Sequence, residues 1–193
     1  MTKSPPVSAA LIIIDVQQAI DHPKWARWGP RNNPHAEDNL ARLLAAWRST
    51  QRPVFYVRHM SREAESPYRP NQPGNDFKSQ VAPWPNERII EKSTNSAFIG
   101  TALETDLRAT GIDTLIITGV ITNNSVEATA RMAGNLGFTT IVVSDATATF
   151  ARHDFNGVLR SAEEVHAMSL ANLQDEYAAI MTTAEVLAAL ADD

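Results

Sequence analysis

Short apolar runs alternate along the chain with longer stretches in which apolar residues recur at helical spacing. The runs predict buried strands, and they are Ala10–Ile14, Val54–Val57, Arg88–Ile90, Thr114–Ile117, Thr139–Val143 and Ile180-Met181. Apolar residues at helical spacing form three groups: Leu40, Leu43, Leu44 and Trp47; Ile99, Leu103 and Leu107; and Val165, Met168, Leu173 and Tyr177. The last group predicts a long helix. Repeated strand–helix units indicate an α/β fold. We therefore expect a doubly wound, six-stranded, mainly parallel sheet with helices on both faces.

Residues typical of helix ends support this assignment. Asn33-Pro34 predicts a helix start, with Asn33 as the N-cap and proline at the first helical position. Gly111 closes one helical stretch and Gly137 closes another, which runs from Ser125 to Leu136. A final helix is expected from Thr183.

Composition narrows the class of protein. The chain has 193 residues, enough for one domain with a sizeable core, and we expect a single domain over residues 1–193. The net charge of -5 argues against nucleic-acid and membrane-surface binding, because both use basic patches. No apolar run is long enough to span a membrane. Met1–Ser8 lacks the basic and then apolar order of a secretory signal, so we expect a cytoplasmic protein.

Three polar residues stand just after predicted strands. Asp15 follows the first strand, Lys92 the third and Ser125 the fourth. Each has an ordinary structural explanation on its own, as a cap, a solvated lysine or a helix N-cap. In a doubly wound sheet, however, ligands bind beyond the carboxyl ends of the strands, where the strand order reverses. We therefore predict that the three side chains meet at one edge of the sheet.

The residues around these positions resemble the isochorismatase-like cysteine hydrolases, a family that includes nicotinamidase, N-carbamoylsarcosine amidohydrolase and ureidoacrylate hydrolase. The family's turn reads roughly G-V-x-T-x-x-C-V-x-x-T-A-R. Gly119 to Arg131 carries every landmark except the cysteine, whose place Ser125 takes, and the chain contains no cysteine at all. Ile14-Asp15-Val16-Gln17 and the stretch from Glu91 to Phe98 resemble the family's other two motifs. The resemblance extends over nearly the whole chain.

The resemblance implies an amidohydrolase that cleaves a C–N bond in a small amide, ureido or carbamoyl compound through a covalent acyl-enzyme. It implies that Asp15 is the general acid and base, that Lys92 holds Asp15 ionised, and that residue 125 is the nucleophile. The N–H groups of Ile121 and residue 125 would form the oxyanion hole. A non-proline cis peptide bond between Val120 and Ile121 is also implied.

Serine at position 125 changes the expected activity. A thiol with a pKa of about 8.5 can be tuned towards neutrality, whereas an alkanol hydroxyl is a far weaker acid. No histidine stands at an evident partner position. We expect little or no amide turnover. We interpret the chain as an inactive Cys-to-Ser variant, engineered to trap substrate, and a natural serine variant is the alternative.

Two other functions stay open at this point. One is an isochorismatase-type vinyl ether hydrolase, which needs no cysteine nucleophile. The other is a catalytically dead binding protein that has kept the fold. Thr122-Asn123-Asn124 favours the amidase, because the isochorismatase turn typically has aromatic and histidine residues there.

The sequence predicts neither a metal nor another cofactor. Nicotinamidases bind a metal with an aspartate and two histidines after the second strand, and here that region contains one histidine, His59. Trp25, Trp28 and Trp84 lie in proline-containing loops. Tryptophans in exposed loops often line a pocket or a subunit interface, and both interpretations stay open here. The candidates for substrate contact are Gln18, Trp28, His59, Trp84 and Phe150. As partners, the resemblance implies a small-molecule amide and a second or further copies of the chain, in a homodimer or homotetramer.

Overall fold

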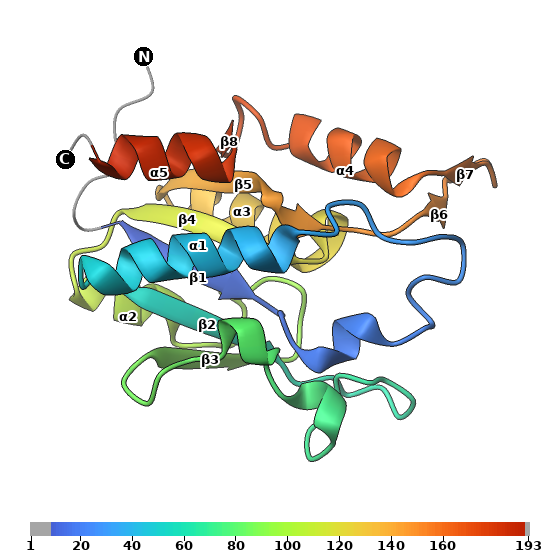
Figure 1. The fold of residues 1–193 in the computed structure, drawn as a ribbon, viewed down its shortest axis with the longest axis horizontal. Coiled ribbons are helices and arrows are strands. Elements are labelled where there is room, and N and C mark those ends of the chain that lie inside the picture. The colour runs from blue at the N-terminus through green and yellow to red at the C-terminus, as the bar shows by residue number, and fades with distance from the viewer. Residues whose placement is uncertain (1–8, 192–193) are drawn as a thin grey trace.

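A computed structural model of the chain describes residues 9–191. The expectation that Met1–Ser8 hold no secretory signal concerns residues outside this range. A six-stranded sheet, with every neighbouring pair parallel, runs in the order β3-β2-β1-β4-β5-β8 (Figure 1). Its strands are β1 (Ala10–Ile14), β2 (Val54–His59), β3 (Arg88–Lys92), β4 (Thr114–Val120), β5 (Thr139–Ala148) and β8 (Ala179–Met181). The predicted doubly wound α/β sheet is confirmed.

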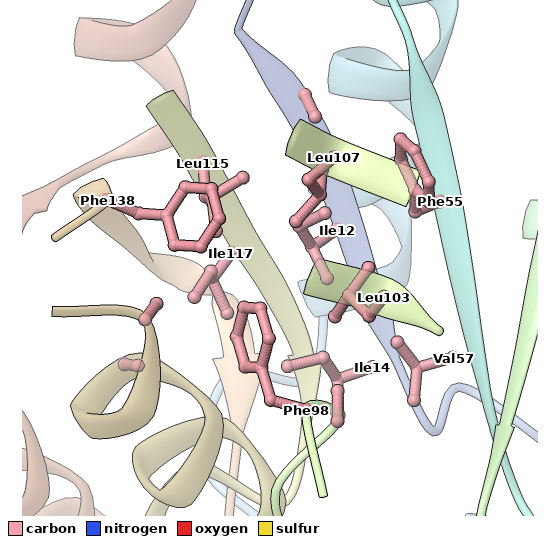
Figure 2. Close-up of a cluster of buried hydrophobic side chains, with 14 of the residues drawn as sticks. Ile12, Ile14, Phe55, Val57, Phe98, Leu103, Leu107, Leu115, Ile117 and Phe138 are labelled. Carbon is pink, nitrogen blue, oxygen red and sulfur yellow. The ribbon is translucent and has the colours of Figure 1, made fainter. Parts of the chain in front are cut away.

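Helices cover both faces of the sheet, and they are α1 (Ala36–Ser49), α2 (Leu103–Ala109), α3 (Glu127–Asn135) and α5 (Thr183–Ala191). α1 and α5 pack on one face, and α2 and α3 pack on the other (Figure 1). In β1, Ile12 and Ile14 belong to the cluster beneath α2 and α3 that Figure 2 shows, whereas Leu11 and Ile13 face α1 and α5. Successive side chains of a strand point to opposite faces. A strand buried on both sides is therefore apolar throughout.

Asn33 is not the N-cap that its sequence context predicts. The helix begins two residues after Pro34, at Ala36, and His35 is its N-cap. The Asn33 side chain instead donates to the carbonyls of Ser144 and Thr147, at 2.8 and 2.7 Å. These carbonyls lie where the pairing of β4 with β5 shifts register, so a tertiary contact with the irregular part of β5 outweighs the local capping signal.

Two further helix predictions need correction. The helix α4 (Ala162–Ala171) starts with a capping box at Ser161, but it ends well before Tyr177. Asp175 has a φ of +65°, outside the helical region, and the chain turns there into β8. Ile99 does not lie on the helix with Leu103 and Leu107, because α2 begins at Leu103 and Ile99 is exposed.

Short elements within the connections between strands and helices were not predicted. They are the 3₁₀ helices η1 (Gln18–Asp21), η2 (Pro73–Asn75) and η3 (Ser79–Val81), and the antiparallel pair β6 (Arg152–His153) and β7 (Leu159–Arg160). In Figure 1, β6, β7 and α4 lie together, beyond the end of the sheet. No helix within residues 9–191 is long and apolar enough to cross a membrane.

A buried ion-pair network joins two of these loop regions to the body of the fold. The Glu37 carboxylate, near the start of α1, accepts hydrogen bonds from Arg31 at 2.7 Å and from Lys78 at 3.0 Å. Lys78 also contacts Asp21, at 2.9 Å. Burial alone would raise the pKa of Glu37, but the hydrogen bonds from Arg31 and Lys78 outweigh it and lower that pKa to about 2.

Replacing Glu37 with glutamine is expected to lower the free energy of unfolding at pH 7 by about 3 kcal/mol. The folded pKa of about 2 lies below the ordinary value of 4.5, so the ionised carboxylate stabilises the fold above pH 4.5. That contribution is lost as the pH falls from about 4.5 to about 2. Urea unfolding between pH 7 and pH 3 should therefore show the two proteins converging as the pH falls.

The matched control for this prediction is Glu65→Gln, which removes an exposed carboxylate from the same loop region as Lys78. We expect the control to change stability by less than about 0.5 kcal/mol at every pH. A loss of unfolding free energy in Glu37→Gln that is the same at every pH would show that the ionisation of Glu37 does not stabilise the fold.

Candidate active site

The order of the strands reverses between β1 and β4, which are neighbours in the sheet although β2 and β3 separate them in sequence. Asp15 directly follows β1, and the turn that contains Ser125 directly follows β4. Lys92 is the last residue of β3, beyond β2. Asp15 and Ser125 thus lie at the reversal point, where doubly wound sheets bind ligands. Lys92 starts two strands away, and its long side chain reaches both of them from the same edge of the sheet.

Lys92 connects the other two side chains. Its ammonium donates to Asp15 Oδ2 at 2.6 Å, to Ser125 Oγ at 3.2 Å and to the carbonyl of Thr94 at 3.1 Å. Lys92 is only 2% exposed, Asp15 5% and Ser125 7%. A buried ammonium needs such partners, because an unpaired buried charge is very costly. The convergence predicted from sequence is thus present, at contact distance.

Asp15 is held by backbone contacts that leave part of its carboxylate free. It has a φ of +55°, its N–H donates to the carbonyl of Val57 at 3.0 Å, and its carbonyl accepts from the Tyr68 hydroxyl at 3.2 Å. Within the described residues, the buried Oδ1 of Asp15 has no hydrogen-bond partner. This oxygen is available to accept a proton or a substrate N–H.

Ser125 lies in a π-helical turn, Thr122–Val126, that leads into α3. The peptide bond from Val120 to Ile121 is cis, which confirms the geometry that the resemblance implied. Side chains from other elements fix the turn, since Thr149 donates to Asn123 Oδ1 at 2.5 Å and Thr122 Oγ1 lies 3.0 Å from His166 Nδ1. The α4 helix thereby contacts the turn that carries residue 125.

A pocket of about 560 Å³ opens above these residues. Its lining includes Asp15, Ile121 and Ser125, together with three of the predicted contact residues, Trp28, His59 and Phe150. Trp28 and Phe150 come from segments far apart in the chain, before α1 and after β5. Contact of Trp28, His59 and Phe150 with a substrate stays a prediction. The fold nevertheless brings all three side chains to the same pocket.

The structure does not place Gln18 or Trp84 in the lining of this pocket, and a contact of either residue with a substrate stays a prediction. Gln18 starts η1, and its side chain is exposed. Trp84 is 52% exposed, and its ring packs under the Arg48 guanidinium at 4.2 Å. The loop that carries Trp84 runs along α1, on which Arg48 lies. A tryptophan in a proline-containing loop therefore did not distinguish a pocket residue from one that packs on a helix.

Tyr68 is a residue that the sequence analysis missed. It is buried in the pocket wall and contacts both the Asp15 carbonyl and the rings of Trp25 and His59. Burial and the negative charge of Asp15 raise the pKa of Tyr68 well above its ordinary value, so it stays a hydrogen-bond donor. The available signal was that Tyr68 is the one tyrosine between Ser61 and Asn86, a stretch too long for a plain connection and predicted to cover a site.

His59, at the end of β2, lines the pocket and lies next to Lys92. Its Nδ1 is 3.4 Å from Lys92 Nζ. Burial lowers the pKa of His59; the nearby Lys92 lowers it further, while Asp15 opposes the shift. His59 is therefore neutral at pH 7. Within residues 9–191, no three His, Asp or Glu side chains are grouped to hold a metal ion, and the metal-free site stays a prediction.

These features define an α/β protein with a lysine–carboxylate pair and a hydroxyl at the base of a pocket, which is the arrangement of a hydrolase site. The family model described as the isochorismatase domain matches residues 9–185. The chain therefore belongs to the isochorismatase family of hydrolases.

Similar proteins agree with this membership. The isochorismatase family protein YrdC of Bacillus subtilis is 45% identical over 178 residues, 92% of this chain and 94% of YrdC. The ureidoacrylate amidohydrolase RutB of Methylobacterium radiotolerans is 27% identical over 201 residues, covering 88% of this chain and 74% of RutB.

Solved structures show the same fold. An isochorismatase-family protein from Chromobacterium violaceum is 52% identical with a TM-score of 0.95, covering 100% of this chain and 98% of that one. A cysteine hydrolase from Pseudomonas syringae pv. phaseolicola is 27% identical with a TM-score of 0.88, covering 100% of this chain and 96% of that one.

Proposed function

We propose that this site is that of an amidohydrolase, which cleaves the C–N bond of a small amide, ureido or carbamoyl compound through a covalent acyl-enzyme. The observation that carries the proposal is the Lys92 ammonium, which contacts both the Asp15 carboxylate at 2.6 Å and the Ser125 hydroxyl at 3.2 Å. Similarity to an amidohydrolase and to a cysteine hydrolase supports this reaction class.

With cysteine at position 125, each group has a role in the reaction. Asp15 accepts the thiol proton, and the sulfur attacks the carbonyl carbon to give a tetrahedral oxyanion. The N–H groups of Ile121 and residue 125, both in the pocket lining, stabilise this oxyanion. Asp15 returns the proton to the leaving nitrogen as the C–N bond breaks. It then takes a proton from the water that hydrolyses the thioester and returns it to the departing sulfur, which restores the thiol and the carboxylate.

The contacts of Asp15 and Lys92 support these roles. Oδ2 of Asp15 is bound to Lys92, whereas the buried Oδ1 has no partner in the described residues and is left to exchange the proton. The ammonium of Lys92 holds the Asp15 carboxylate in place and attracts a negative charge on the atom at residue 125. Lys92 therefore orients the base and stabilises the nucleophile.

In the chain as it stands, Ser125 takes the place of the nucleophilic cysteine, and we propose that it makes the protein an inactive, substrate-trapping form. The Lys92 ammonium is paired with the Asp15 carboxylate and donates to the Ser125 hydroxyl, so it is not placed to act as a base for that hydroxyl. A carboxylate is too weak a base to deprotonate an alkanol. The site can bind an amide without turning it over.

A test of the reaction class is to incubate the Ser125→Cys variant with a panel of small amides, ureido and carbamoyl compounds and, separately, with isochorismate. Ammonia or amine release from the panel supports the amidohydrolase. Cleavage of isochorismate alone, by the serine-containing chain and by the Ser125→Cys variant alike, would establish the vinyl ether hydrolase instead. No turnover of either would leave the catalytically dead binding protein and overturn the proposal.

A further inference from the structure

Three cations line the pocket at its solvent side. Lys24 and Arg27 belong to the segment between η1 and α1, and Arg152 belongs to β6. Lys24 is half-buried, and the other two are exposed. Among residues 9–191, no carboxylate lies within ion-pair distance of any of the three. Unpaired cations gathered at one pocket are unexpected in a chain with a net charge of -5.

The acids in the same lining do not neutralise these cations. They are Asp15, which is ion-paired with the buried Lys92, and Glu63, which is exposed. The lining of the pocket therefore carries more positive than negative side chains. Charged clefts with low-dielectric walls concentrate ligands of the opposite sign. The pocket is suited to an anion, although the protein as a whole repels one.

Aromatic rings restrain two of the three cations, Lys24 and Arg27. The Arg27 guanidinium lies 3.8 Å over the Trp28 ring, and Lys24 lies 4.6 Å from the Trp25 ring. The Trp28 ring in turn meets His153 edge-on at 4.8 Å, next to Arg152. This contact brings the segment that carries Arg27 against β6. A guanidinium stacked on a ring keeps its N–H groups free to donate in its own plane, and restraint before binding lowers the entropy cost.

We propose that Lys24, Arg27 and Arg152 form an anion-binding site that receives a carboxylate of the substrate while the amide carbonyl lies at residue 125. The planar guanidinium fork matches a carboxylate in a bidentate arrangement. This inference rests on the proposed amidohydrolase function and narrows its substrate class to small amides with a carboxylate at the end away from the scissile bond.

The test compares monoamides of dicarboxylic acids, from malonamate to adipamate, with the corresponding diamides. Each pair differs only in whether the distal group is a carboxylate or a neutral, nearly isosteric carboxamide. Calorimetric titration into the serine-containing chain should show at least one monoamide binding about tenfold more tightly than its diamide. That preference should fall as salt is raised from about 50 to about 500 mM, because exposed charges are screened.

The Arg27→Gln/Arg152→Gln double variant should lose the preference for the monoamide and bind the diamide unchanged. Arg62→Gln is the matched control, since Arg62 is exposed in the loop after β2 and outside the pocket lining. Equal binding of monoamide and diamide at every length, binding of neither, or a preference that survives the double variant would overturn the anion site.

Failure of this inference and failure of the proposed function give different results. If the Ser125→Cys variant hydrolyses monoamides and diamides with equal KM, the amidohydrolase stands and the anion site falls. If it hydrolyses neither, yet the serine-containing chain binds a monoamide selectively through the two arginines, the anion site stands and the proposed reaction falls.

Discussion

Replacing Ser125 with cysteine is expected to raise kcat/KM for amide hydrolysis by at least about a thousandfold. The side chain at this position is 7% exposed, beside a buried ammonium at 3.2 Å and a carboxylate held by the same ammonium. A thiol in this setting has its ordinary pKa of about 8.5 lowered towards neutrality by the positive charge, so the thiolate is accessible to Asp15 as base. The serine hydroxyl is too weakly acidic for the same carboxylate.

Steady-state rates and intact-protein mass spectrometry would test this prediction on the best amide of the panel. The Ser125→Cys variant should accumulate a covalent acyl adduct, and the serine-containing chain should not. Ser125→Ala is the control for contaminating activity, and the Asp15→Asn/Ser125→Cys double variant should lose most of the gain. Equal rates with serine and with cysteine at position 125 would refute the assignment of this residue as the nucleophile's position.

Replacing Gly119 with alanine is expected to lower the free energy of unfolding by more than about 4 kcal/mol or to prevent folding. Gly119 has a φ of +111°, and an added Cβ would lie 2.1 Å from the carbonyl oxygen of Ile14 and 2.7 Å from its nitrogen. Both atoms belong to the backbone of β1, so neither can move aside cheaply. Asp15 follows Ile14 in the chain, and Val120 follows Gly119. A backbone shift that relieves the clash therefore also displaces Asp15 and the turn that carries Ser125.

Gly100→Ala separates the steric clash from the effect of backbone conformation. Gly100 also has a positive φ, +68°, but a Cβ there would meet no atom within 4 Å. We expect this control to cost only about 1–2 kcal/mol. Urea unfolding measures the loss of unfolding free energy in both variants. Similar losses for Gly119→Ala and Gly100→Ala would show that the close approach of β1 to β4 does not exclude a Cβ at position 119.

The strands were predictable because a parallel sheet covered on both faces selects apolar residues at every position. Ala10–Ile14 is the clearest case, with side chains in both hydrophobic clusters. The prediction was incomplete where polar residues enter a strand. β5 continues through Ser144 and Asp145 to Ala148, because side chains such as Asn33 satisfy the backbone of the irregular segment. No local pattern reports such a contact.

The three residues at the base of the site could be predicted, because each lies at or just after the carboxyl end of a strand and the topology of the sheet brings these ends together. The walls of the pocket could not. Tyr68 and Arg27 come from loops and Arg152 from the short strand β6. Contacts between these segments place them, such as the edge-on packing of Trp28 on His153. For the same reason Trp84 resembled a pocket residue in sequence, although it lies against Arg48.

By itself, the sequence determined the α/β class of this protein and the positions of Asp15, Lys92 and Ser125, because strand periodicity and residues at strand ends are local properties. The tertiary structure alone decided that Lys92 contacts both other residues, that Asp15 keeps a free carboxylate oxygen, and that cations gather at the pocket. Those features depend on distances between segments far apart in the chain, which packing sets and local residue patterns do not encode.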